Sequence, residues 1–116
     1  MRDVHAAWAW VVIVSNALAA SWALAAHYRA PFRRRELWWF TAGAQISGFV
    51  QAVLGVGIQT SEDIEPNDFH MLYGFSILVT VGILYSYRAQ MPDHRYLLYA
   101  GGGFFIMGLG LRALFL

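Results

Sequence analysis

The sequence predicts an all-α integral membrane protein, folded as an antiparallel four-helix bundle. Three observations support this prediction. Of the 116 residues, 59% are hydrophobic and only 13% are charged, whereas an ordinary soluble domain has about 25% charged residues. The apolar residues form four runs, each long enough to cross about 30 Å of hydrocarbon as a helix. Short segments rich in charge separate these runs, so residues 1–116 are expected to form a single transmembrane domain.

The first predicted span is 4–26, an apolar run with only four polar interruptions: His5, Ser15, Asn16 and Ser21. A secretory signal peptide is the alternative, because Arg2 precedes the run and Ala23-Leu24-Ala25 resembles a cleavage site. The arginine cluster that follows the run favours a retained span, since such a cluster holds its end of a helix in the cytoplasm.

The second predicted span is 37–58. It follows a short loop, 27–36, in which Pro31 prevents the first helix from continuing. The loop holds four arginines and Glu36, a net charge of +3. The tryptophans at positions 38 and 39 open the span, and amphipathic rings of this kind favour the membrane–water interface.

The third and fourth predicted spans are 69–87 and 96–116. An acidic loop precedes the third span and has a charge of −4, with no basic residue; its acidic residues are Glu62, Asp63, Glu65 and Asp68. A second basic loop, 88–95, separates the third span from the fourth, and Pro92 interrupts the helix there.

Arginine placement predicts the orientation. The two basic loops follow the first and third spans, and basic loops stay on the cytoplasmic side. Both termini are therefore expected outside, in a multi-pass protein of a bacterial inner (plasma) membrane. The prediction depends on six arginines: Arg29, Arg33, Arg34, Arg35, Arg88 and Arg95.

Each predicted span also has one stripe of small or polar residues, which in a membrane helix tend to face other helices. Glycines in these stripes are expected where backbones approach closely. The four stripes are His5, Ala9, Val12 and Asn16; Ser47, Gln51 and Gly55, with Ala44, Gly48 and Ala52 beside them; His70, Gly74, Ile77 and Val81; and Gly101, Gly108 and Arg112.

The predicted topology brings five candidate site residues toward the outer end of the bundle. His5 and His70 begin parallel helices, so one imidazole on each side of a heme b iron is the sharpest hypothesis. Gly74 would leave space for the flat ring, and Arg112 would pair with a propionate. Simpler interpretations are interfacial histidines, a snorkelling arginine, and Gln51 in an interhelical hydrogen bond.

Part of this pattern resembles a known family. Gln51-x-x-x-Gly55, an outward loop and His70 in the next helix are similar to a helix pair in the four-helix half-bundles of heme A synthase, and His5 extends the likeness. The resemblance implies that heme is held between the histidines. The chain lacks the synthase's acidic residue beside a histidine, its cysteine pair and its second half-bundle, so heme oxidation is not implied.

A second resemblance is to small uncharacterised bacterial four-span membrane proteins. It depends on two short segments, His70-Met71-Leu72-Tyr73-Gly74 and Leu111-Arg112-Ala113. This likeness supports the four-span fold and implies no activity.

Other chemistries have weaker support. A quinol site would use His70 with Tyr73 and Asp68. The acidic loop lacks the spacing and the glycine of a calcium-binding loop. The absence of cysteine excludes disulfides and thiolate sites. No phosphate-binding loop or nucleophile elbow is present, so an enzyme is not expected.

The expected role is therefore that of a non-catalytic accessory, stabilising or assembly subunit of a larger membrane complex, for example a respiratory one. Five tryptophans and eight phenylalanines suit helix packing and interface anchoring. The expected partners are lipids and other integral membrane subunits, or further copies of the chain, and no nucleic acid. The alternatives are a b-type heme protein with His5 and His70 as axial ligands, and a small carrier or channel component.

Overall fold

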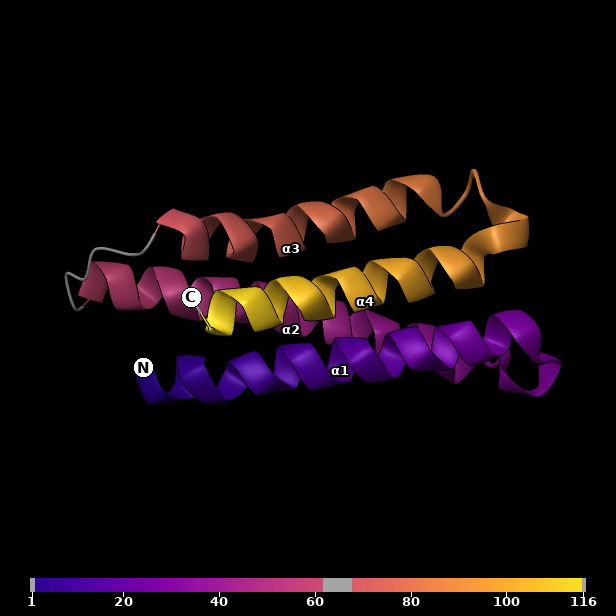
Figure 1. Ribbon diagram of the computed structural model, residues 1–116, viewed down its shortest axis with the longest axis horizontal. Helices are drawn as coiled ribbons and strands as arrows, with labels where there is room; N and C mark the ends of the chain where they lie inside the picture. The colour runs from indigo at the N-terminus through magenta and orange to yellow at the C-terminus, as the bar shows by residue number, and fades with distance from the viewer. Residues whose placement is uncertain (1, 62–67, 116) are drawn as a thin grey trace.

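The computed structural model of the protein describes residues 2–61 and 68–115. Within these residues all regular structure is helical, as predicted (Figure 1). In chain order the elements are α1 (Arg2–Tyr28), the 3₁₀ turn η1 (Ala30–Phe32), α2 (Arg35–Ser61), α3 (Asp68–Tyr87), the 3₁₀ turn η2 (Pro92–His94) and α4 (Arg95–Leu114). The first three helices include the predicted spans 4–26, 37–58 and 69–87. The fourth ends at Leu114, short of the predicted 116.

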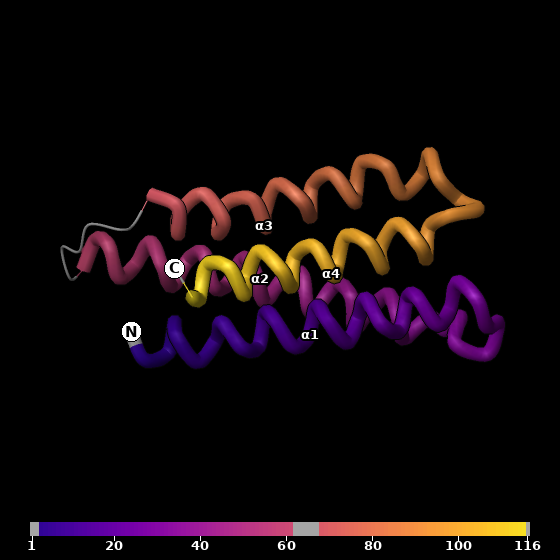
Figure 2. The backbone as a smooth tube through the Cα atoms, viewed as in Figure 1, coloured from indigo at the N-terminus to yellow at the C-terminus, as the bar shows by residue number. Residues whose placement is uncertain are grey.

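The four helices run alternately up and down along the longest axis of an elongated bundle of 49 × 23 × 20 Å (Figures 1 and 2). The labelled N and C ends lie at one end of the bundle, and the turns η1 and η2 lie at the other. Helix α1 packs extensively against α4 and α2, and α3 packs against α4. The described residues of α2 and α3 make few contacts with each other, so the bundle is least closed along this seam.

All four helices are long and apolar enough to cross a membrane. Their outer faces expose large apolar side chains, which water would disfavour and lipid would not. Examples from the four helices are Val14, Leu18, Ile46, Val53, Leu72, Val79, Leu97 and Phe105.

Small residues allow α1 to lie close to its neighbours. Ala20 is buried, and a Cβ added at Gly103 of α4 would stand only 2.7 Å from the Ala20 Cβ. Asn16 is also buried, and its Nδ2 donates to the carbonyl of Ala44 on α2 at 3.2 Å. Close backbone approach and buried polar contacts of this kind stabilise helix pairs within membranes.

The predicted inward stripe of α4 is wrong. Gly101, Gly108 and Arg112 are all exposed, and among the described residues nothing lies within 4 Å of a Cβ added at either glycine. The inward face carries Gly103 and Ile106 instead. With three glycines in a row, helix α4 could have turned any one of them toward its neighbours. The rotation that turns Gly103 inward also buries large apolar residues of α4 in the core, and this is the rotation observed.

The basic turns lie at one end of the bundle, and aromatic packing and one arginine stabilise that end. Trp38 stacks on Tyr96 with ring centroids 5.4 Å apart, and the edge of Tyr99 completes the cluster. The Arg33 guanidinium donates to the carbonyls of Ala26 at 2.6 Å and His27 at 2.9 Å. These carbonyls belong to the last turn of α1, so Arg33 satisfies acceptors that the helix itself leaves unpaired.

Candidate functional site

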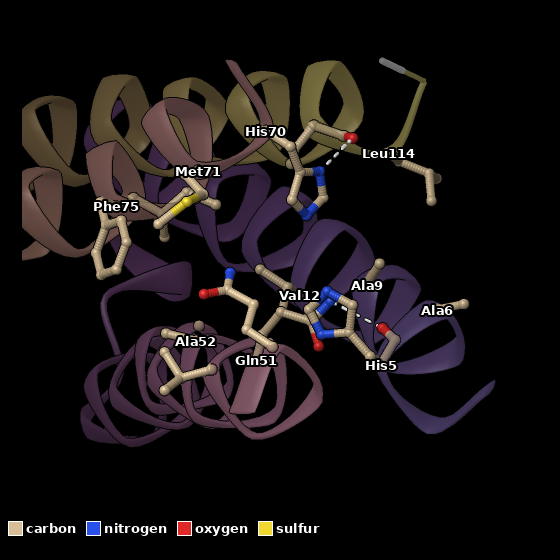
Figure 3. Close-up of a pocket in the computed structure, with 18 residues that line it drawn as sticks. His5, Ala6, Ala9, Val12, Gln51, Ala52, His70, Met71, Phe75 and Leu114 are labelled. Carbon is tan, nitrogen blue, oxygen red and sulfur yellow. Dashed lines mark hydrogen bonds between the residues drawn. The ribbon is translucent and has the colours of Figure 1, made fainter. Parts of the chain in front are cut away.

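A cavity of about 350 Å³ lies inside the bundle toward the end that carries the termini (Figure 3). All four helices contribute to its lining. Its walls are mostly apolar or small residues, and its polar side chains are two histidines and two glutamines: His5, Gln51, Gln59 and His70. An apolar cavity that is partly open to the surface and has a few convergent polar groups is the usual form of a ligand site.

His5 enters the cavity from the first turns of α1, and its ring packs against Gly55 of α2. A Cβ added at Gly55 would lie 3.2 Å from the imidazole Cε1, so glycine allows the ring to lie close to the α2 backbone. The Nδ1 atom of His5 is buried and has no hydrogen-bond partner among the described residues. Buried polar atoms of this kind normally pair with a water or a ligand.

His70 enters from the first turn of α3, on the opposite wall (Figure 3). Its Nδ1 lies 2.9 Å from the carbonyl oxygen of Ala113 on α4. A carbonyl oxygen can only accept, so Nδ1 carries the hydrogen and Nε2 is the lone-pair nitrogen of the neutral ring. Metal-binding histidines are commonly fixed by such a bond from the other ring nitrogen.

The two imidazoles face each other across the cavity (Figure 3), with ring centroids 6.1 Å apart and planes at 64°. Metal–imidazole bonds are about 2 Å long, so two rings on opposite sides of one metal ion have centroids about 6 Å apart. Ligation leaves each ring free to rotate about the line through the two ring nitrogens and the metal, so the angle between the ring planes is not fixed. The spacing of His5 and His70 therefore matches a pair of axial ligands.

Gln51 connects α2 to the start of α1. Its Nε2 donates to the main-chain carbonyl of His5 at 2.8 Å, which fixes the backbone that carries the imidazole. Its Oε1 is buried and, within the described part of the chain, has no partner. Gly74 of α3 also lines the cavity, and a Cβ added there would meet none of the described atoms within 4 Å. That position leaves open volume below His70.

Arg112 is the predicted site residue that the structure separates from the others. It is exposed and does not line the cavity, and its guanidinium carbon lies 5.9 Å from the ring centroid of Tyr73. Tyr73 and Asp68, the predicted partners of His70 in a quinol site, do not line the cavity either. Of the acidic loop, Glu62, Asp63 and Glu65 lie outside the described residues.

The ligand set limits the metal chemistry. Across residues 2–61 and 68–115, no group of three or more histidine, cysteine, aspartate or glutamate side chains could hold a metal ion. A site with two imidazoles suits a metal whose remaining positions are filled by a macrocycle, because the protein then has to supply only the axial ligands.

Two parts of the site were missed by sequence reasoning. The Ala113 carbonyl orients His70, but a main-chain oxygen leaves no signal in a sequence. Val56 and Phe75 line the cavity between α2 and α3, yet each looks like an ordinary apolar residue of a membrane span.

No family model, curated protein or solved structure matches this chain.

Proposed function

We propose that this protein is a multi-pass membrane protein that holds one heme b between His5 and His70, with both termini on the outer side. The observation that supports it best is the pair of imidazoles facing each other at 6.1 Å across an internal cavity. Arginines of the two basic turns support the orientation, because both turns lie at the end opposite the histidines.

The residues around the cavity fit a heme. Nε2 of each histidine would bind iron, and Gly74 provides volume beside the axial position. Apolar side chains, including Val12, Met71 and Ile77, suit the porphyrin faces. Iron bound at Nε2 would not pair with His5 Nδ1 or Gln51 Oε1, which are buried without partners among the described residues, so a polar group or a water has to satisfy these two atoms when the site is filled.

The proposed ligation also limits the chemistry. Heme iron with histidine on both faces exchanges single electrons and keeps no open position for a substrate. The role that follows is binding heme or passing electrons rather than transforming a substrate. The chain's own contribution is to fix the two imidazoles and exclude water from the cavity.

Heme titration of the purified protein tests this proposal. Addition of hemin should produce a sharp Soret band that saturates at one heme per chain. His5→Ala and His70→Ala should each weaken or abolish the band. His94→Ala is the matched control, because His94 lies in η2 at the opposite end of the bundle. A wild-type spectrum identical to that of hemin in empty detergent micelles would contradict the proposal.

An accessory subunit is the second candidate, favoured by an outer groove between α1 and α2. It is lined by small residues, Gly43, Ala44 and Ser47, and by Trp8 and Trp39. Small residues in membrane helices allow another helix to approach closely. Co-purification of a defined membrane complex in mild detergent, lost on Gly43→Trp, is the expected result. A solitary monomer in mild detergent would contradict it.

A further inference from the structure

The wall of the cavity has a side opening between α2 and α3. Val56 of α2 and Phe75 of α3 both line the cavity, yet 45% of Val56 and 47% of Phe75 is exposed. Ala6 of α1 also lines the cavity and is exposed, toward the end of the bundle that carries the termini. A residue that borders the interior and the surface at once lies at the edge of an opening. Val56 and Phe75 are therefore the two edges of this side opening.

The side opening leads toward hydrocarbon rather than toward water. Both edge residues are apolar, and both lie within helices that are long and apolar enough to cross a membrane. A flat apolar ligand could therefore pass between the cavity and the bilayer without exposing its faces to water.

The packing of the helices makes this seam the easiest to separate. Helix α1 is held by extensive contacts with α2 and α4, and α3 by those with α4, whereas α2 and α3 touch little. His5 lies on α1 and His70 on α3. Moving α3 away from α2 would therefore widen the side opening and separate the two axial ligands in one motion, with little loss of packing.

From this arrangement we propose that the protein is a reversible heme carrier, which exchanges heme with the surrounding bilayer through the side opening. This inference rests on the proposed heme site. The exchange needs no redox partner. Release would break the iron–nitrogen bonds to both His5 and His70, with each electron pair staying on its Nε2, and loading would form both bonds again.

Heme transfer from loaded protein in phosphatidylcholine vesicles to apomyoglobin tests the proposal. The double variant Val56→Ala, Phe75→Ala widens the opening. Heme transfer should become about fivefold faster, which is the factor that a barrier lower by about 1 kcal/mol implies. The matched control is Val53→Ala, Phe105→Ala, because these residues are 71% and 57% exposed and do not line the cavity. The control should transfer at the wild-type rate.

A disulfide between α2 and α3 should have the opposite effect on the rate of heme transfer, because it holds the side opening closed. A Cβ added at Gly48 of α2 would lie 3.2 Å from Cγ2 of Ile77 on α3, so Gly48→Cys with Ile77→Cys would place two thiols beside each other across the seam. The chain has no other cysteine. Oxidation of a heme-loaded sample should slow transfer, and reduction should restore it.

The outcomes separate this inference from the heme site itself. An intact Soret band, with transfer rates unchanged in both the widened and the bridged variants, would overturn the side opening and leave the heme site standing. Absence of a Soret band from the wild-type protein would refute both.

Discussion

The carbonyl oxygen of Ala113 on α4 accepts a hydrogen bond from Nδ1 of His70 on α3 at a distance of 2.9 Å. Ala113 lies in the last turn of α4, too close to the end of the helix for an N–H of the helix itself to reach its carbonyl. One bond therefore satisfies a helix terminus and fixes the orientation of an imidazole. The end of α4 thus acts as part of the candidate site, although α4 contributes neither of the two histidines.

Filling the cavity below His70 should remove heme binding without unfolding the bundle. In Gly74→Leu the new Cβ meets none of the described atoms within 4 Å, so the side chain can enter the cavity and occupy the volume needed by a ligand. Heme affinity should fall by at least about tenfold, equivalent to 1.4 kcal/mol. Spectroscopic titration measures the affinity, and circular dichroism should show an unchanged helix content.

Gly82→Leu is the control for this change. Gly82 lies on the same helix with similarly open surroundings among the described residues, but it does not line the cavity. Equal heme affinity in the two leucine variants would contradict the assigned position of the ligand.

Loss of the Gln51 amide should affect both stability and the site. Gln51→Leu removes the donor to the His5 carbonyl. Interhelical hydrogen bonds in membranes contribute about 0.6 kcal/mol on average and up to about 1.7 kcal/mol. We expect a decrease of this size in the unfolding free energy, measured by detergent denaturation, together with weaker heme binding. Gln45→Leu, on the same helix but away from the cavity, should bind heme normally.

The contact between α1 and α4 should be sensitive to a single methyl group. In Gly103→Ala the new Cβ would lie 2.7 Å from the Ala20 Cβ and 3.2 Å from the Asn16 carbonyl, so the two helices must move apart. Overpacking of this kind destabilises by about 1–3 kcal/mol. Detergent denaturation should detect this loss. Gly101→Ala, at an exposed position of the same helix, should be neutral, and equal effects of the two changes would argue against the observed rotation of α4.

The orientation in the membrane can be tested with single cysteines, because the natural chain has none. We expect Asp3→Cys and Phe115→Cys to react with a membrane-impermeant maleimide in intact cells. Gln90→Cys, between α3 and η2, should react only after the membrane is permeabilised. Labelling of Gln90→Cys in intact cells would reverse the orientation assigned from the arginines.

Much of the fold was predictable from local features of the chain. Apolar length, together with prolines at positions 31 and 92, located the helices and their turns. Alternating helix direction then brought His5 and His70 to the same end of the bundle, since each begins an odd-numbered helix. The distance between them confirms this part of the prediction.

The features that the sequence did not predict depend on packing between helices that are distant in sequence. The triplet Gly101–Gly103 left the rotation of α4 undetermined, and the predicted placement of Arg112 followed that wrong rotation. The opening beside Phe75 exists because α2 and α3 pack less closely than the other neighbours, which is a property of the whole bundle. No local pattern in the sequence encodes such a difference.

Electron paramagnetic resonance of the ferric, heme-loaded protein tests the central claim most directly, because it reports the ligands on both faces of the iron. Two axial imidazoles predict a low-spin signal from the wild-type protein, replaced by a high-spin signal in His5→Ala and in His70→Ala. A high-spin signal from the wild-type protein, or a low-spin signal that survives both substitutions, would show that His5 and His70 do not share one iron.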